Sequence, residues 1–294
     1  MHRKGAWKVA GLFGPPRGGS ATLEPVLSEP IAGPRNDVYV FGIPFWNPTL
    51  AQFLDWWRAA LTSDARTGRC VVLANAHTLN LAYEDPEYAD VLRSADVRLN
   101  DGIGFRLASG MRSVDVRHNF NGTDLVPLLF QRLDRPARVF LYGAKENVNA
   151  LAALRVAERF PAVEVVGRCN GYVDPEEAAA QIASSGADVL LVALGNPKQE
   201  RFMARYRDRL NVKVQIGCGG LFDFLSGTKP RAPRPIRRHG LEWAFRLAVE
   251  PRRMFRRYVI GNPVFLARAW LSRKADLDLL GVLPAKRRLS PPVL

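Results

Sequence analysis

The sequence predicts an α/β protein with a mostly parallel sheet covered by helices on both faces. Short apolar runs rich in β-branched residues alternate with amphipathic segments, and the links between them are short. Several of the runs end in glycine-containing loops. The chain is 47% hydrophobic and 24% charged, which is typical of a globular protein, and 294 residues suffice for one main domain.

Composition divides the chain into three parts. Residues 1–36 are rich in glycine, proline and arginine without periodicity, so we expect a disordered or loosely attached leader. Residues 37–228 contain the alternating strands and helices of the main domain. Residues 229–294 combine arginines with aromatic side chains in stretches separated by Glu250-Pro251, which predicts a small basic, amphipathic helical appendage.

Hydrophobic periodicity gives the order of elements in the main domain. The run VYVFGIPF has the character of one strand, and the next segment places five apolar residues at helical spacing: Leu50, Phe53, Leu54, Trp57 and Leu61. Six later runs predict strands: RCVVLANA, DVRLNDGIG, ARVFLYGA, VEVVGRCNGYV, ADVLLVALG and VKVQIGCGG. Helical segments lie between them: HTLNLAYEDPEYADVLRSA, NVNALAALRVAERF, PEEAAAQIASSG and QERFMARYRDRL.

Positive charge is concentrated at the carboxyl end of the chain. Sixteen basic and four acidic residues follow position 228, so this part carries +12 of the formal net charge of +14. Three interpretations stay open from charge alone: a solvated basic face over a core helix, contact with an anionic membrane, or nucleic-acid binding. The aromatic, proline-divided helices make nucleic acid the least attractive of the three.

Cysteine usage and hydropathy indicate a cytoplasmic protein. Cys70, Cys169 and Cys218 stand far apart and have no zinc-ligand spacing, so we expect neither a disulfide scaffold nor a bound metal. No run approaches the roughly 20 apolar residues of a membrane-spanning helix, and the N-terminus lacks an apolar signal core. We therefore expect a protein that neither spans a bilayer nor is secreted.

Asp101 is the main candidate for chemistry. It follows the strand-like alternation of Val97 and Leu99 and precedes two glycines, in a loop where backbone can approach a ligand closely. Ligands of parallel sheets bind beyond the carboxyl ends of the strands, so a general base fits this position. An Asx turn or a helix N-cap explains the same residue without chemistry.

Other strand ends carry weaker candidates. In GNPKQE, Gly195 fixes a turn, Lys198 offers a cation, and a helix beginning near Gln199 favours a diphosphate, although plain capping explains these residues equally well. Asp223 after IGCGG is compatible with a nucleoside contact or a simple turn. His77 stands at a strand-to-helix junction, where it is either a substrate ligand or structural.

Five motifs together resemble one enzyme family in order and spacing. They are ANAHTLNLAYEDPEYADVLRSADVRLNDGIG, NGTDL, GNPKQE, FDFLSGTKPRAP and GLEWAFRLAVEPRRMFRRYVIGNPVFL. Over about residues 37–268 the chain resembles the WecG/TagA/CpsF glycosyltransferases, also called glycosyltransferase family 26. The resemblance implies a Rossmann-like domain that moves a sugar, with inversion, from a UDP-sugar to a polyprenyl-diphosphate-linked saccharide.

The resemblance also implies the setting of the reaction. It implies no metal and no cofactor, and an appendage that meets an anionic membrane from the inner face of the plasma membrane. The product class is a bacterial surface polysaccharide, such as an exopolysaccharide, capsule or wall polymer. A homo-oligomer stays open, and no nucleic-acid partner is expected.

Residue roles follow from the same resemblance. Asp101 is the implied base, Asn75 lines the donor site, and Gln199 contacts the nucleotide sugar, with Gly195 and Lys198 beside it. Tyr172 and Asp223 are weaker nucleoside candidates. Four arginines are implied to hold the diphosphate of donor or acceptor: Arg231, Arg246, Arg253 and Arg257.

One geometric condition and two departures qualify these roles. Arg246, Arg253 and Arg257 share one helical face if the helix continues through Pro251. Relatives often have Thr where this chain has Leu73 and Arg where it has Asn119, so those two roles do not transfer. His77, Arg117 and His118 are candidates to compensate for them.

Two rivals from other classes make different predictions. An NAD-dependent sugar-nucleotide oxidoreductase needs a glycine fingerprint after its first strand, and VYVFGIPFWNP does not supply one. A nucleic-acid-binding protein would use the basic tail and show salt-sensitive affinity for DNA or RNA.

Overall fold

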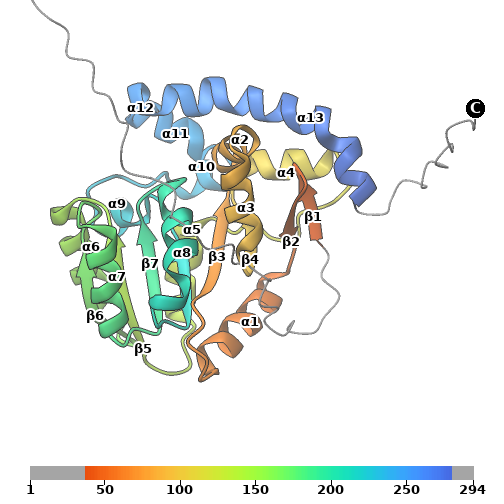
Figure 1. The fold of residues 1–294 in the computed structure, drawn as a ribbon. Helices are drawn as coiled ribbons and strands as arrows, with labels where there is room; N and C mark the ends of the chain where they lie inside the picture. The colour runs from red at the N-terminus through yellow and green to blue at the C-terminus, as the bar shows by residue number, and fades with distance from the viewer. Residues whose placement is uncertain (1–36, 280–294) are drawn as a thin grey trace, which may run out of the picture. The chain divides into compact units, whose positions relative to one another are not determined.

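The computed structural model describes residues 37–279, and its centre is a parallel sheet (Figure 1). The predicted leader 1–36 and residues 280–294 of the predicted appendage lie outside the described residues. Each of the six later apolar runs forms one strand: β3 (Arg69–Ala74), β4 (Val97–Asn100), β5 (Ala137–Gly143), β6 (Val163–Cys169), β7 (Val189–Ala193) and β8 (Val214–Gly217). Their spatial order is β4-β3-β8-β7-β5-β6, with every pairing parallel.

Helices cover both faces of the sheet, which confirms the predicted α/β class. Along β3, Cys70, Val72 and Ala74 point into one core, whereas Val71 and Leu73 point into the other. The helices that follow in chain order are α1 (Leu50–Thr62), α2 (Ala76–Glu84), α3 (Pro86–Ser94), α4 (Ile103–Gly110), α5 (Gly122–Gln131), α6 (Glu146–Arg159), α7 (Pro175–Ser184), α8 (Lys198–Tyr206) and α9 (Leu221–Leu225). Helices α1, α5, α6 and α9 pack on one face, and α2, α3, α4, α7 and α8 pack on the other.

Helices α4 and α5 have no predicted counterpart in the sequence. Gly104 and Gly110 weaken the helical signal of α4, and Pro127 lies inside α5. Burial of Phe105, Leu125 and neighbouring side chains against the sheet outweighs these poor local propensities.

The first predicted strand is two strands, so this prediction was wrong in detail. β1 (Asp37–Val40) and β2 (Ile43–Trp46) form an antiparallel hairpin that is separate from the main sheet. Between them Phe41 and Gly42 have φ values of 57° and 69°, the left-handed pair that a two-residue hairpin turn requires. The apolar run conceals this turn because Phe41 is an unusual residue at such a position.

The carboxyl-terminal part forms helices that pack on the α/β core. They are α10 (Arg234–Arg238), α11 (Glu242–Val249), α12 (Pro251–Phe255), a π-helical turn η2 (Arg256–Ile260) and α13 (Gly261–Leu279). Helix α13 packs against α2, α4 and β1, with Phe265 and Ala269 fully buried (Figure 1). Glu250 has φ −130° and ψ 62°, so α11 and α12 are separate, as predicted from Glu250-Pro251. The condition for one helical face shared by Arg246, Arg253 and Arg257, a helix that continues through Pro251, is therefore not met. Within residues 37–279, no helix has the length and apolar character to cross a bilayer.

A buried ion pair ties α13 to the rest of the chain. Arg112, after α4, donates to Asp276 through Nε at 3.1 Å, and its Nη2 binds the same carboxylate. Asp276 also accepts the backbone N–H groups of Phe41 and Gly42 at 3.2 and 2.7 Å. One buried carboxylate therefore joins α13, the end of α4 and the β1–β2 turn.

Candidate active site

Three loops meet where β4, β3 and β8 end. These strands are neighbours in the sheet and parallel, so their carboxyl ends lie along one edge, as predicted. Asp101 follows β4, Asn75 follows β3, and Gly219 comes shortly after β8. The loop after β7, with Gly195, lies next along this edge.

The carboxylate of Asp101 binds the side chain of Asn75. Asn75 Nδ2 donates to Asp101 Oδ2 at 3.3 Å, while Asn75 Oδ1 caps α2 by accepting the N–H groups of His77 and Thr78. Because the cap needs the amide oxygen, the amide nitrogen must face Asp101. The backbone N–H of Asp101 donates to Ala74 O at 2.8 Å, which ties this loop to the end of β3.

The surroundings make Asp101 a stronger base than an ordinary aspartate. Burial, with a smaller contribution from the negative charge of Glu242, raises the pKa of its carboxyl group to about 6. The hydrogen bond from Asn75 and the charges of Arg257 and Arg246 act in the opposite direction. With a pKa of about 6, most of this group is ionised at neutral pH. Residue 101 is partly exposed, so its carboxylate is accessible for proton transfer.

Arginines from two separate helices surround this carboxylate. Arg257 Nη2 donates to Asn75 Oδ1 at 3.3 Å, and its Nε is buried without a hydrogen-bond partner in the described part of the chain. Arg246 lies over the Phe224 ring, 5.5 Å from its centroid, beside Gly220. Burial lowers the pKa of Arg257, and the charges of Arg246 and Arg253 lower it as well, so the three cations share one region despite the break at Pro251.

Arg253 and Arg231 form ion pairs with acidic residues, unlike Arg246 and Arg257. Arg253 is largely exposed and pairs with Glu250 at 3.3 Å. Arg231 Nη2 donates to Thr123 Oγ1 at 2.9 Å and pairs with Asp124 at 2.6 Å, at the start of α5. Arg231 thus lies against the NGTDL segment, while Arg253 faces solvent.

Glu242 is a second carboxylate in this region that the sequence analysis did not single out. Its Oε2 accepts from Asn121 Nδ2 at 3.2 Å, and its charge reaches Asp101. Asn121 is also the N-cap of α5, so Glu242 connects α11 to the NGTDL segment. The one feature of the sequence that could have indicated Glu242 is its rarity, because only four acidic residues follow position 228.

In the GNPKQE loop, three predicted residues lie in different surroundings. Gly195 has φ 76°, and no described atom lies within 4 Å of where its Cβ would stand. Lys198 is exposed at the start of α8. Gln199 is buried: its Oε1 accepts the N–H of Gly219 at 3.0 Å and its Nε2 donates to Glu200 at 2.7 Å.

Asp223 and Tyr172 lie in different surroundings. Asp223 is beside Gly220, next to Arg246. Asp223 pairs with Lys229 at 2.6 Å, and Lys229 also pairs with Glu250. Tyr172 is 78% exposed in the loop after β6, the strand at the opposite end of the sheet from β4. At about 4.8 Å per strand, five strand spacings place β6 roughly 24 Å from β4. The loop after β6 turns back toward the middle of the sheet, because the N–H of Gly171 donates to Ala144 O at 2.8 Å.

Leu73 and Asn119, the two residues that depart from the family pattern, lie in different surroundings. Leu73 is a core residue of β3, and its Cδ1 lies 2.9 Å from where a Cβ on Gly122 would stand, so it has no access to a ligand. Asn119 is exposed and accepts the N–H of Gly102 at 2.8 Å. His77 is held neutral at pH 7, because burial and the charge of Arg257 lower its pKa to about 4.

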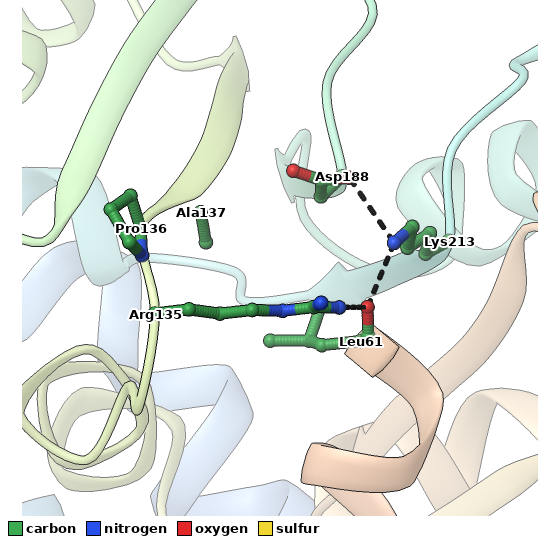
Figure 2. Close-up of a pocket in the computed structure, with 6 residues that line it drawn as sticks. All are labelled: Leu61, Arg135, Pro136, Ala137, Asp188 and Lys213. Atoms are coloured by element: carbon green, nitrogen blue, oxygen red, sulfur yellow. Dashed lines mark hydrogen bonds and ion pairs between the residues drawn. The ribbon is translucent and has the colours of Figure 1, made fainter. Parts of the chain in front are cut away.

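A separate pocket of about 250 Å³ lies at the opposite edge of the sheet (Figure 2). Lys213 Nζ donates to Leu61 O at 2.8 Å and lies 3.7 Å from Asp188, and Arg135 binds the same carbonyl oxygen. Leu61 is in the last turn of α1, where cations satisfy the free carbonyl groups of a helix end. This pocket contains none of the predicted site residues.

Residues 37–279 hold no group of three His, Cys, Asp or Glu side chains arranged for a metal.

Comparison with known proteins identifies the relatives of this chain. The family model described as the glycosyl transferase WecG/TagA/CpsF family matches residues 38–278. Three relatives share the name N-acetylglucosaminyldiphosphoundecaprenol N-acetyl-beta-D-mannosaminyltransferase. The Bacillus spizizenii protein is 40% identical over 65% of this chain and 75% of its own length. The Bacillus subtilis protein is 35% identical over 72% and 83%, and that of Staphylococcus aureus 27% identical over 78% and 90%.

Proposed function

The chain belongs to the WecG/TagA/CpsF family of glycosyl transferases, and we propose that it transfers an N-acetylhexosamine from a UDP-sugar to a polyprenyl-diphosphate-linked saccharide. The named activity of its relatives makes N-acetylmannosamine the first donor sugar to test and N-acetylglucosaminyl-diphosphoundecaprenol the first acceptor. The product would enter a bacterial surface polysaccharide. The observation that carries the proposal is the partly exposed Asp101, bound to Asn75 and faced by Arg257 and Arg246.

The proposed chemistry is a single displacement with inversion. Asp101 takes the proton of an acceptor hydroxyl as that oxygen forms a bond to the anomeric carbon of the donor sugar. The bond from this carbon to the diphosphate oxygen breaks on the opposite face, and its electron pair leaves with UDP. Proton transfer to a carboxylate with a raised pKa suits this step, because the base is ionised and still basic at neutral pH.

Arginines are proposed to stabilise the departing diphosphate. Negative charge grows on UDP in the transition state, and Arg246 and Arg257 place positive charge at the edge of the sheet where Asp101 lies. The buried, unpartnered Nε of Arg257 is a hydrogen-bond donor of the kind that a phosphate oxygen satisfies. These cations would do the work of a divalent ion, so we propose metal-independent transfer.

Replacing Asp101 by Asn tests this mechanism. The carboxamide keeps the size of the side chain but accepts no proton, so turnover should fall at least a thousandfold while UDP binding persists. The measurement is UDP release from a panel of UDP-sugars with the diphosphate-linked acceptor, beside calorimetric UDP titration. Normal turnover in Asp101→Asn would remove Asp101 from the mechanism.

We further propose that α12, η2 and the start of α13 attach the protein to an anionic membrane surface. Phe255, Val259 and Ile260 are 52%, 41% and 50% exposed. Exposed arginines, Arg252 and Arg256 among them, alternate with these apolar side chains. Apolar side chains that enter the interface beside cations that pair with lipid headgroups give reversible attachment without a spanning helix.

A pair of matched double variants tests the membrane proposal. Phe255→Ser with Ile260→Ser should reduce binding to phosphatidylglycerol vesicles at least tenfold, because two apolar side chains are lost from the interface. Leu151→Ser with Leu154→Ser removes two leucines of α6 that are 40% and 53% exposed and should leave binding unchanged. Vesicle sedimentation measures both, and equal losses in the two variants would count against a specific surface.

A further inference from the structure

Residues 118–120 run beside the loop that carries Asp101 and are bonded to it on both sides. Asn100 Nδ2 donates to His118 O at 3.0 Å, and the N–H of Phe120 donates to Asn100 O at 3.1 Å. Beyond Asp101, the N–H of Gly102 donates to Asn119 Oδ1 at 2.8 Å. The backbone of His118 and Phe120 therefore holds Asn100, the residue before Asp101. The side chain of Asn119 holds Gly102, the residue after it.

Gly102 has an unusual backbone conformation and lies at a helix end that no side chain caps. Its φ of 89° and ψ of 172° fall in a region that essentially only glycine adopts. Gly102 is also the N-cap position of α4, yet no side chain caps this helix in the usual way. Asn119 supplies the acceptor for the Gly102 N–H from outside the helix, and it does so from an exposed position where no core packing depends on it.

We propose that Asn119 is a positioning residue for Asp101. By holding the Gly102 peptide, its side-chain oxygen fixes the direction in which the preceding carboxylate points, together with the hydrogen bond from Asn75 on the other side. The kinetic part of this inference rests on the proposed function, whereas the contact itself does not. Displacing a catalytic group by about 1 Å can cost a hundredfold in rate, so the orientation of one peptide matters.

Three variants of the full-length protein separate positioning from other roles. Asn119→Ala removes the acceptor, Asn119→Asp retains an acceptor oxygen but adds a negative charge, and Asp115→Ala is the control. Asp115 is exposed in the same connecting segment, four residues before Asn119. The charges already facing Asp101 are those of Arg257, Arg246 and Glu242, and the carboxylate of Asn119→Asp would join Glu242 in opposing its ionisation.

Hydrogen exchange followed by mass spectrometry tests the contact without any substrate. In Asn119→Ala, peptides covering residues 100–105 should exchange at least severalfold faster, because the Gly102 N–H has lost its acceptor. Asn119→Asp and Asp115→Ala should exchange like the unaltered protein. This result is independent of which sugar the enzyme uses.

Steady-state kinetics test whether Asn119 affects the rate of transfer. The donor is the UDP-sugar that the unaltered protein uses. Asn119→Ala should lower kcat roughly tenfold to a hundredfold while the donor KM changes less than about threefold. Asn119→Asp should restore kcat at high pH, with the acidic limb of its pH profile moved to higher pH. Asp115→Ala should match the unaltered protein in both respects.

Three results would overturn the proposal. An unchanged kcat in Asn119→Ala overturns it, whatever the rate of amide hydrogen exchange in residues 100–105. Loss of kcat that Asn119→Asp does not recover at any pH, even when exchange is faster in Asn119→Ala, means that Asn119 contacts the substrate itself. Unchanged exchange in Asn119→Ala shows that the contact does not hold the loop. If no UDP-sugar supports turnover by the unaltered protein, the proposed function fails, and the exchange experiment still decides the contact.

Discussion

Asp101 combines two properties that an enzyme base needs and an ordinary surface aspartate lacks. Its carboxylate accepts a hydrogen bond from Asn75, and burial disfavours its charged form. Neither property is visible at position 101 alone. They depend on Asn75 from the neighbouring strand and on Glu242, Arg246 and Arg257 from the carboxyl-terminal helices.

The pH dependence of transfer should report this environment. Only ionised Asp101 accepts a proton, so kcat/KM should rise about tenfold per pH unit at low pH and level off above pH ~6, since the pKa is about 6. Glu242→Gln removes a negative charge that raises this pKa, so the acidic limb should move to lower pH. Glu87→Gln, an exposed substitution of the same charge on α3, should leave the profile unchanged. A limb that moves upward in Glu242→Gln would contradict this electrostatic account.

Among the elements, α13 is held by polar contacts as well as by apolar packing. Arg112 and Asp276 are both about 1% exposed, and Asp276 also serves the β1–β2 turn. A buried charge that loses its partner is strongly destabilising, whereas an exposed ion pair contributes little. The pair therefore fixes the carboxyl-terminal helices that bring Arg257 to Asn75.

Arg112→Ala should lower the free energy of unfolding by about 3–5 kcal/mol, because Asp276 would stay buried without its cation. Arg155→Ala breaks an exposed pair with Glu158 at 3.2 Å and should cost less than about 1 kcal/mol. Urea unfolding followed by circular dichroism measures both. A loss below about 1 kcal/mol in Arg112→Ala would show that apolar packing alone holds α13.

At the scale of the whole molecule, charge is divided between the two parts of the chain. Residues before position 229 carry only +2 of the net +14, so the cations come to the edge of the sheet from the carboxyl-terminal helices. The same helices present exposed arginines and apolar side chains to the outside. One segment can thus serve a diphosphate on its inner side and a lipid surface on its outer side.

If arginines replace a divalent ion, metal removal should leave catalysis intact. Dialysis against EDTA should change kcat by less than about twofold, whereas Arg257→Gln should lower it at least a hundredfold, because the departing diphosphate loses a charged donor. UDP release with and without added Mg²⁺ or Mn²⁺ is the measurement. Activity that EDTA abolishes and Mg²⁺ restores would contradict metal-independent transfer.

The sequence alone determined the α/β class, the six strands of the main sheet and the regional charge, because periodicity and composition are local properties. It also predicted that the loops after the strands share one edge, which follows from parallel strands. It could not find α4 and α5, whose glycines and proline weaken the helical signal, nor the turn inside VYVFGIPF.

Only the tertiary structure decided which of these loops are neighbours. The order β4-β3-β8-β7-β5-β6 places Asn75 beside Asp101 and sets β6, the strand before Tyr172, at the far end of the sheet. The structure also shows that α13 docks through Asp276. These are contacts between residues tens to hundreds of positions apart, and no local pattern encodes them. The free energy of burying whole faces against each other selects the strand order, and the site forms as a consequence.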